Sequence, residues 1–469
     1  MSVLNRIIKT ASRFLVNRAA RAEESGRLTD LGLWGLDVNA NGRLSVNGQD
    51  AVELVERFGS PLLVVNRKKL IEDARRALAA FNCAPVGSRI LYSYKTNCIP
   101  GILKELHGAG LGAEVISPYE LWLAERLGVP GEMTIYNGVA KTPESIEAAL
   151  RRNILSINID SAEEVETILT IADKLRIQGR VGIRLGFSAK SQFGLDVHGN
   201  EAMKVCERIA ALKGRLEFSC IHFNVTSNSR WASTHKHYAG RAVEFMAEMK
   251  AKTGLVAQYL DIGGGFGVET TKNMSGAEYG MYRLFGCLPS PPKVADFPPI
   301  ESFFNEIIEA IKAKCSELQL ETPKIIIEPG RLITSKSEFL LTKVNTIKTR
   351  PDGTTYAMTG AGRLSMTFPC DFEYHAAFVA DRPEARPERL YNVMGRVCTS
   401  ADWMFKNRLL PKLNAGDVLA VMDAGAYFSS YSSNFAFQRP AIVMVSETGN
   451  ASVLRAQESF EHLVAMDNI

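Results

Sequence analysis

Short apolar runs alternate with amphipathic segments through the middle of the chain. The apolar runs lie at 90–94, 111–116, 133–136, 155–159, 180–185, 218–225, 257–262 and 324–327. Helical patterns separate most of them, at 119–127, 143–152, 162–175, 201–212, 238–252 and 300–318. Eight strand–helix units within one stretch of the chain predict a (β/α)8 barrel of the TIM type.

The periodicity changes on both sides of this stretch. Two short runs around the turn at 39–42 predict a hairpin within 31–60, and β-rich runs at 340–348, 418–423 and 441–446 predict a mostly-β domain. We therefore expect an N-terminal helix and strands (1–60) that join the β domain, a barrel (61–333) and a C-terminal β domain (334–469). Residues 268–300 interrupt the rhythm and are expected to form a loop over one mouth of the barrel.

Composition narrows the classes of protein that fit. The 55 basic and 51 acidic residues leave a net charge of +4, which indicates no nucleic-acid-binding surface. No apolar run approaches the ~20 residues of a membrane span. The eight cysteines show no CxxC spacing and no secretory signal precedes them, so we expect reduced thiols in the cytoplasm. The first 22 residues are basic and amphipathic, as in a transit peptide or in a helix packed on its own protein, and we favour the packed helix.

Lys95 follows the first predicted strand, at the end of a barrel where active sites gather. Burial would lower the pKa of this lysine and favour the neutral amine, which attacks an aldehyde to form a Schiff base. A lysine in this place can also simply extend to the surface. The strand end alone therefore leaves both interpretations open.

Other candidate residues follow the sixth, seventh and eighth predicted strands. Three consecutive glycines leave backbone N–H groups unshielded, which suits a phosphate, while a hydroxyl and an arginine nearby would add further donors. A carboxylate beside them would keep a pyridine nitrogen protonated. Together with the lysine, these groups predict a site for pyridoxal 5'-phosphate (PLP). They are Gly263, Gly264, Gly265, Ser227, Arg331 and Glu328.

Five motifs resemble, in the same order, those of the fold-type III PLP-dependent decarboxylases, the group of diaminopimelate and ornithine decarboxylases. The motifs are YKTN at 94–97, DIGGGF at 261–266, EPGR at 328–331, CTSAD at 398–402 and DAGAY at 423–427. The resemblance covers about residues 55–445. It implies a barrel with a C-terminal β domain of the alanine racemase and decarboxylase type, a PLP cofactor, and a homodimer with active sites shared between subunits.

The resemblance also implies roles for single residues. Lys95 would carry the cofactor, Glu328 would face its pyridine nitrogen, and Tyr427 would reach its phosphate together with the serine, glycines and arginine named above. Cys398 would come from the partner subunit and return a proton to the carbanion after carbon dioxide leaves, since a thiol at a fixed place delivers a proton from one side. A buried, purely structural cysteine is the alternative for Cys398.

The chain departs from the family pattern at several positions. Asn224 stands where the family has a histidine stacked on the cofactor ring. Thr399 replaces an acidic residue that receives a distal ammonium, and Phe368 replaces an arginine that grips a distal carboxylate. Asp402 lacks its expected lysine partner across the dimer because Gln192 stands there. Arg363 and Arg396 are further candidates for binding an acidic substrate tail.

These departures predict decarboxylation of a non-standard or conjugated amino acid, as in siderophore or other specialised biosynthesis, because burying an unpaired distal ammonium is costly. Two alternatives stay open at this point. Asn224 suggests racemisation, epimerisation or another α-carbon reaction, and a non-catalytic regulatory relative is the third possibility. No metal site is expected, since His235 and His237 lie far in sequence from any clear ligand set.

Overall fold

The computed structural model describes residues 3–188, 190–367 and 369–468, which divide into two compact units. The barrel unit consists of residues 73–267 and 298–332, and the sheet unit of residues 1–72, 268–297 and 333–469. The chain passes from one unit to the other after residues 72, 267, 297 and 332. The domain boundaries expected after residues 60 and 333 stay predictions. Residues 268–297, which we expected within the barrel domain, group with the sheet unit.

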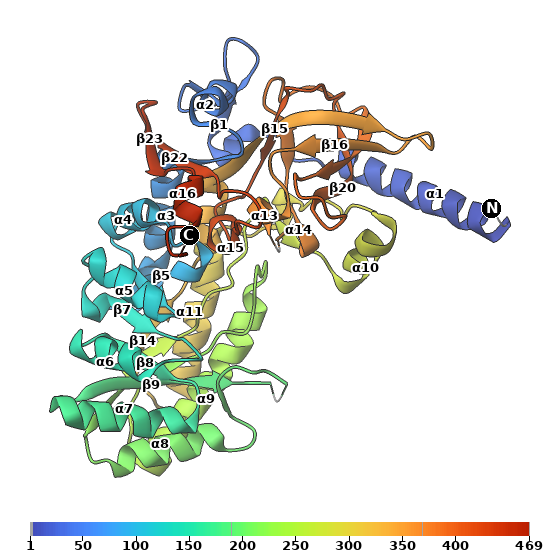
Figure 1. The fold of residues 1–469 in the computed structure, drawn as a ribbon. Helices are drawn as coiled ribbons and strands as arrows, with labels where there is room; N and C mark the ends of the chain where they lie inside the picture. Colours follow the sequence, from blue (N-terminus) through green and yellow to red (C-terminus); the bar gives the residue numbers. More distant parts are fainter. Residues whose placement is uncertain (1–2, 189, 368, 469) are drawn as a thin grey trace. The chain divides into compact units, whose positions relative to one another are not determined.

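The barrel unit is built on eight parallel strands (Figure 1). They are β5 (Arg89–Ser93), β6 (Gly112–Val115), β7 (Thr134–Tyr136), β8 (Ser156–Ile159), β9 (Gly179–Gly186), β11 (Leu216–His222), β12 (Tyr259–Asp261) and β14 (Lys324–Ile327). The pairing of β8 with β9, in which Asn158 lies opposite Gly182, closes the sheet. The predicted (β/α)8 barrel is therefore confirmed.

Helices follow the strands as the sequence predicted. They are α4 (Pro100–Gly108), α5 (Pro118–Arg126), α6 (Pro143–Arg151), α7 (Ala162–Leu175), α8 (Glu201–Ala211), α9 (Ala232–Thr253) and α11 (Ile300–Glu317). Side-chain hydrogen bonds cap the N-terminal ends of two of these helices. At α5 the Ser117 side chain accepts from Glu120 N, and at α6 Thr142 and Ser145 form a capping box. Apolar side chains from strands around the barrel pack together inside it, among them Leu91, Ile135 and Ile326.

The sheet unit contains a nine-stranded sheet and a small three-stranded one. The large sheet has β4 (Leu62–Asn66), β15 (Glu338–Thr349), β16 (Thr355–Thr359), β18 (Ala377–Val379), β19 (Arg389–Met394), β20 (Trp403–Leu410), β21 (Val418–Val421), β22 (Ala441–Val445) and β23 (Ala451–Arg455). The predicted hairpin forms β1 (Leu36–Val38) and β2 (Leu44–Val46), which β3 (Gln49–Asp50) extends. One apolar cluster joins Trp34 and Leu44 to Phe339 and Val443, so distant segments of the chain share this core.

The segment 268–297 contains more structure than the expected loop. It includes β13 (Lys272–Asn273), which pairs with β17 (Glu373–Tyr374), and α10 (Gly276–Phe285). Ser275 and Glu278 form a capping box at the start of α10. The S-x-x-E spacing that encodes this cap was present in the sequence and would have predicted the helix.

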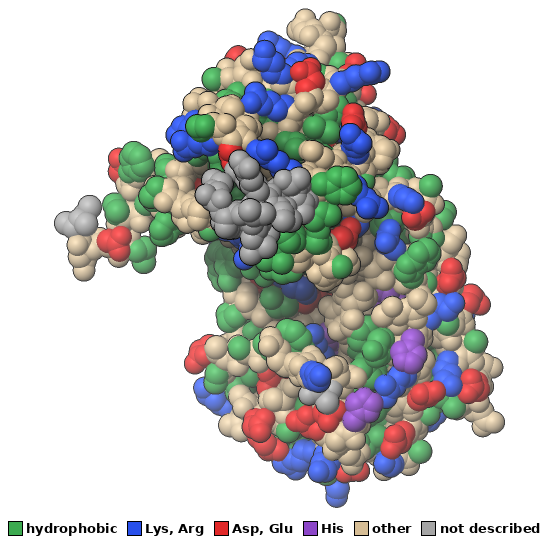
Figure 2. Space-filling model, turned by 90° about the vertical axis from the view of Figure 1, so that its right-hand side faces the viewer, with side chains coloured by type: hydrophobic (Ala, Val, Ile, Leu, Met, Phe, Trp, Pro, Cys, Tyr) green, Lys and Arg blue, Asp and Glu red, His purple; other side chains and the backbone are tan. Residues whose placement is uncertain are grey.

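The N-terminal helix α1 (Val3–Ser25) is fixed to the sheet unit near its C-terminal end. Glu23 is fully buried and pairs with the buried guanidinium of Arg408 at 3.3 Å, and Tyr374 Oη donates to Glu23 at 3.2 Å. The end of α1 is thus packed on the sheet unit, whereas Phe14 of the predicted apolar face is exposed, and the preference for a packed helix over a transit peptide in the first 22 residues stays a prediction. Among the described residues, no helix is both long and apolar enough to cross a membrane. On the face drawn in Figure 2, basic and acidic side chains are interspersed, as the balanced composition leads us to expect.

Candidate active site

Loops after four barrel strands contact one another at the carboxyl end of the barrel. Ser93 N donates to Pro329 O at 3.2 Å, Glu328 N donates to Gly263 O at 2.8 Å, and Ser229 N donates to Gly265 O at 2.8 Å. These bonds join the segments after β5, β14, β12 and β11. The structure therefore brings together the loops that carry all the barrel candidates: Lys95, Asn224, Ser227, Gly263, Gly264, Gly265, Glu328 and Arg331.

The glycine run fits between backbone segments that leave no room for a side chain. Gly263 and Gly265 have φ of +68° and +80°, which side chains disfavour. A Cβ on Gly263 would lie 2.6 Å from Phe223 O, and one on Gly265 would overlap the carbonyl of Thr226. His235, which we had considered only as a metal ligand, supports this run: its Nε2 lies 3.0 Å from Gly264 O, and its ring stacks on Phe266.

Lys95 has an ionic partner that the sequence analysis missed. Its Nζ donates to Glu114 Oε2 at 2.8 Å, with the lysine side chain one-third exposed and the glutamate fully buried. Ser93 lies opposite Glu114 in the β5–β6 pairing and donates its hydroxyl to the same oxygen at 2.6 Å. The carboxylate is thus held by two neighbours and fixes the position of the lysine amine.

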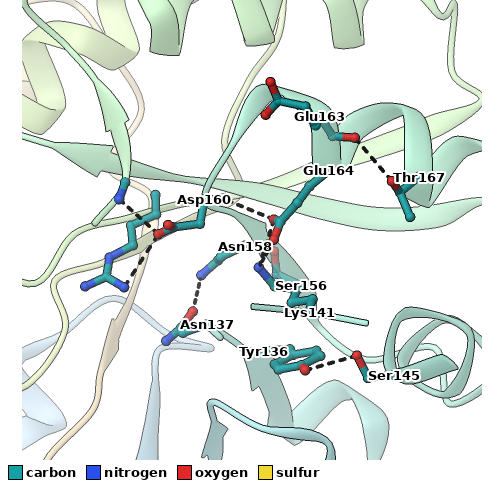
Figure 3. A network of polar contacts seen from close by, with 12 residues as sticks. Tyr136, Asn137, Lys141, Ser145, Ser156, Asn158, Asp160, Glu163, Glu164 and Thr167 are labelled. Atoms are coloured by element: carbon teal, nitrogen blue, oxygen red, sulfur yellow. Dashed lines mark hydrogen bonds and ion pairs between the residues drawn. The ribbon is translucent and has the colours of Figure 1, made fainter. Parts of the chain in front are cut away.

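A chain of buried amides continues from Glu114 across the barrel. Asn137 Nδ2 donates to Glu114 Oε1 at 3.2 Å and also to Glu328 Oε1. Asn158 Nδ2 donates to Asn137 Oδ1 at 2.7 Å, and Ser156 Oγ donates to Asn158 Oδ1 at 2.8 Å. Figure 3 shows Asn137 and Asn158 facing each other from neighbouring strand ends.

Glu328 lies at the centre of a cluster of ionisable groups. His222 Nε2 is 3.6 Å from Glu328 Oε2, and ligand atoms of Glu328, His222 and Asp261 all lie within 4.8 Å of one another. Although burial raises the pKa of Glu328, the charge and proximity of His222 and the ammonium of Lys95 lower it to about 2. Burial and the charge of Glu328 raise the pKa of Asp261. Within this pair, Glu328 is therefore the carboxylate that favours the ionised form, and Asp261 the one whose pKa is raised.

These residues fit the PLP cofactor that the resemblance implies. The site offers an amine after β5, an ionised buried carboxylate, a glycine run that only glycines can form, and Arg331. Asn224 Oδ1 and both ring nitrogens of His222 are buried, and no described residue hydrogen-bonds to them, which leaves polar atoms available for a bound group. Lys95 would hold the cofactor aldehyde, Glu328 would face the ring nitrogen, and the glycine run with Ser227 and Arg331 would hold the phosphate.

The candidates in the sheet unit form a second group, organised by Asp402. Its buried carboxylate accepts from Arg363 N and Val397 N, both at 2.7 Å, and so joins two loops. A Cβ on Gly362 or Gly395 would overlap this carboxylate. The neighbouring Cys398 and Thr399 are exposed on the loop that Asp402 fixes.

The two candidate arginines are engaged by the protein itself. Arg363 donates from Nη1 and Nη2 to the two oxygens of Asp371 at 2.5 and 2.6 Å, and from Nε to Ala401 O at 3.1 Å. Arg396 donates to Gln438 O at 2.9 Å and lies over the ring of Phe437. That these arginines bind a substrate tail therefore stays a prediction. A substrate would have to compete with the internal hydrogen bonds that both guanidinium groups already make.

Two further candidates complete the set. Tyr427 precedes α15 (Phe428–Tyr431) with φ of +71°, and its ring lies 6.2 Å from that of Tyr431. It follows the buried Asp423, which accepts from Trp34 Nε1 at 3.0 Å. Phe368 lies outside the described residues.

Sequence reasoning missed Glu114, Asn137, Asn158 and His222 as members of the site. The first three carry polar or charged side chains in or directly after a buried strand: Glu114 lies within β6 and Asn158 within β8. A buried carboxylate needs a partner, so Glu114 inside an apolar run was the available signal. Asn137 follows β7 and resembles an ordinary turn residue, which gave no such signal.

Comparisons with known proteins agree with this geometry. The model described as the pyridoxal binding domain of pyridoxal-dependent decarboxylases matches residues 67–335, and their C-terminal sheet domain matches residues 331–425. A diaminopimelate decarboxylase from Methanothermobacter thermautotrophicus is 30% identical over 92% of this chain and 97% of its own. One from Aquifex aeolicus is 28% identical over 90% and 95%. A solved diaminopimelate decarboxylase from Methanocaldococcus jannaschii is 28% identical, with a TM-score of 0.80 over 94% of this chain and 99% of its own.

Proposed function

Because the chain belongs to the fold-type III pyridoxal-dependent decarboxylases, we propose that it removes the α-carboxylate of a non-standard or conjugated amino acid. It is a PLP-dependent carboxy-lyase that acts on an amino acid. We further propose that the substrate belongs to specialised metabolism such as siderophore biosynthesis, and that the protein is a homodimer located in the cytoplasm.

Each residue of the barrel site has a defined task in this proposal. The bound cofactor supplies an electron sink for the electron pair that remains when carbon dioxide leaves. Lys95 holds the cofactor, and Glu114 fixes the amine of Lys95 at 2.8 Å. Glu328 stays ionised and keeps the ring nitrogen protonated. Cys398 of the partner subunit donates a proton from its thiol to the α-carbon.

The substrate proposal rests on one observation: the guanidinium of Arg363 already donates to both oxygens of Asp371 and to Ala401 O. A distal carboxylate on the substrate would have to break this bidentate pair. Thr399 offers a hydroxyl but no negative charge to a distal ammonium. The two charged groups at the distal end of a diamino-dicarboxylate would thus lack a free charged partner at these positions, and a substrate with a different tail avoids that cost.

Diaminopimelate is the second candidate substrate, because the three similar proteins are diaminopimelate decarboxylases. The test is carbon dioxide release from the purified holoenzyme with meso-diaminopimelate, ornithine, lysine and a series of N-acylated and citryl-linked amino acids. We expect turnover of diaminopimelate to be at least tenfold slower than that of the preferred conjugated compound. Faster turnover of diaminopimelate would contradict the substrate proposal. Proton exchange at the α-carbon without carbon dioxide release would instead support racemisation or epimerisation.

The shared active site has a separate test. Lys95→Ala and Cys398→Ala proteins are each expected to be nearly inactive, and mixing them after partial unfolding should restore part of the activity. Recovery requires one subunit to supply the lysine and the other the thiol. No recovery, with both proteins folded and dimeric, would contradict the cross-subunit role of Cys398.

A further inference from the structure

A cluster of positive charge lies on the sheet unit, where α10, α13 (Arg363–Met366) and β20 lie together (Figure 1). It consists of Arg283 on α10, Arg363 on α13 and Lys406 on β20. The carboxylate of Asp371 accepts from both Nη atoms of Arg363 at 2.5 and 2.6 Å, and its Oδ1 lies 3.5 Å from Arg283 Nη1. Three cations therefore lie around this one carboxylate, and positive charge exceeds negative charge in the cluster.

Lys406 is half-buried, and no carboxylate of the described residues lies at ion-pair distance from it. Its Nζ donates to Arg283 O at 3.4 Å and lies 4.7 Å from the ring centroid of Trp403. Burial, and after it the charge of Arg283, lowers the pKa of Lys406, whereas the charge of Asp371 opposes this shift. Because burial removes water from the ammonium, keeping it charged without an acid beside it is costly. A bound anion would compensate for this cost.

Helix α10 and one aromatic ring fix the positions of these cations. Lys406 N donates to Tyr282 Oη at 3.1 Å, which joins β20 to α10, and the ring of Tyr282 packs edge-on against that of Trp403. Trp403 is buried, and the guanidinium carbon of Arg363 lies 5.2 Å from its ring centroid. Cation–π contacts of Lys406 and Arg363 with the same ring therefore hold two positive charges in one small region.

The cluster is bonded to the segment that carries Thr399. Arg363 Nε donates to Ala401 O at 3.1 Å, and Arg363 N donates to Asp402 Oδ1 at 2.7 Å. Thr399 stands where related enzymes have the acid that receives a distal ammonium. Because like charges repel and opposite charges attract, a positive cluster beside this position disfavours a distal ammonium and favours a tail that carries carboxylates.

We propose that Arg283 and Lys406 bind the distal tail of the substrate, and that this tail carries at least two carboxylates, one for each of these cations. Arg363 keeps its bidentate pair with Asp371, so no close internal ion pair has to break. Helix α10 then supplies specificity for the distal part of a conjugated amino acid. The inference rests on the proposed decarboxylation of such a compound, whereas the binding of an anion to the cluster does not.

Isothermal titration of the holoprotein with citrate tests the anion site without any turnover. Citrate carries several carboxylates on a short frame, and acetate at equal ionic strength serves as the reference. We expect saturable binding of citrate, weakened about tenfold or more in Lys406→Gln because a charge-assisted bond is lost. Lys406→Arg keeps the charge and should bind citrate far more tightly than Lys406→Gln does. Lys412→Gln, which removes an exposed lysine of the same unit, should leave the affinity unchanged.

Two results of this titration would overturn the proposal: no binding of citrate to the wild type, or equal affinity of the wild type and Lys406→Gln. If Lys406→Gln does not fold, Arg283→Gln provides the same test, because the side chain of Arg283 is 47% exposed. We expect a comparable loss of affinity in Arg283→Gln. An unchanged affinity in that variant would likewise overturn the proposal.

Carbon dioxide release by the holoenzyme separates this inference from the proposed function. The citryl-linked and the acetylated forms of the same diamino acid differ in the charge of their tails. Lys406→Gln should raise KM for the citryl-linked form about tenfold more than KM for the acetylated form. An equal rise for both forms would overturn the inference and leave the proposed function intact. Citrate binding without carbon dioxide release from any conjugated amino acid would contradict the proposed function and leave the anion site intact.

Discussion

Replacing Glu120 with glutamine is expected to stabilise the protein above neutral pH. Glu120 is buried on α5, 7% exposed, and accepts a hydrogen bond from Ile116 N at 2.7 Å. Burial, together with the negative charge of Glu114, raises the pKa of Glu120 to about 7. Glutamine keeps the acceptor for Ile116 N and removes the charge.

The sign and size of the effect follow from proton linkage. In the unfolded chain a glutamate ionises near pH ~4.3, whereas in the folded protein Glu120 holds its proton until about pH 7. Between these two pH values the folded state binds more protons than the unfolded state, so the free energy of unfolding falls as pH rises. Above pH 7 the folded protein bears the full cost of a buried, ionised Glu120. A difference of ~2.7 pKa units corresponds to about 4 kcal/mol, which is the upper limit expected for the gain.

Urea unfolding of the apoprotein between pH 5 and pH 9 measures this gain. Wild type and Glu120→Gln should have similar stability near pH 5, and the variant should become more stable as pH rises to 8. Glu125→Gln, on the exposed face of the same helix, serves as the matched control and should show no such divergence. A difference between Glu120→Gln and wild type that is the same at pH 5 and pH 8 would refute the reasoning.

Three other substitutions address the site and the fold. The Lys95→Ala protein should be folded, as measured by circular dichroism. It should not release carbon dioxide, and it should not retain the cofactor after borohydride treatment. Covalent retention of the cofactor would contradict the role of this lysine. Gly265→Ala places a Cβ against the Thr226 carbonyl at a φ of +80°, a strain of ~1–3 kcal/mol, and should weaken cofactor binding about tenfold or more in a fluorescence titration. Glu23→Ala leaves the Arg408 guanidinium buried without its carboxylate and should cost ~3–5 kcal/mol in thermal unfolding; combining it with Arg408→Met should recover most of that loss.

Local periodicity was sufficient to predict the barrel because apolar residues dominate most of its strands and amphipathic helices separate them. Lys324–Ile327 and Ala162–Leu175 have the bounds expected from the sequence. Helix α9 begins at Ala232, six residues before the expected start, because the histidines at its N-terminal end obscure the apolar pattern. Residues 268–300 were expected to be a loop because five prolines lie between Pro289 and Pro299, and the capping spacing at Ser275 was not considered.

Site residues that belong to a recognisable motif could be predicted from the sequence. Site residues that become neighbours only when the barrel closes could not. Lys95, Glu328 and the glycine run stand in recognisable segments after strands. Asn137 acquires its role because closure of the sheet places its amide between Glu114 and Glu328, which lie far apart along the chain. Arg363 stays a candidate carboxylate ligand, but the fold places Asp371 beside it as a bidentate partner that the sequence did not reveal. Hydrogen-bond and ion-pair partners that lie far apart along the chain depend on tertiary contacts, and no local sequence pattern encodes these contacts.

The two units differ in how freely their candidate residues can change. In the barrel unit, Glu114, Asn137 and Glu328 form one buried network, in which a substitution leaves a buried polar group without its hydrogen-bond partner. In the sheet unit, Asp402 holds the loop backbone, so the exposed Thr399 carries no structural task beyond accepting a hydrogen bond from Ala401 N. A residue without buried partners can be replaced without loss of the fold. Substrate preference in this chain is therefore expected to vary at position 399, while the cofactor chemistry stays fixed by the barrel network.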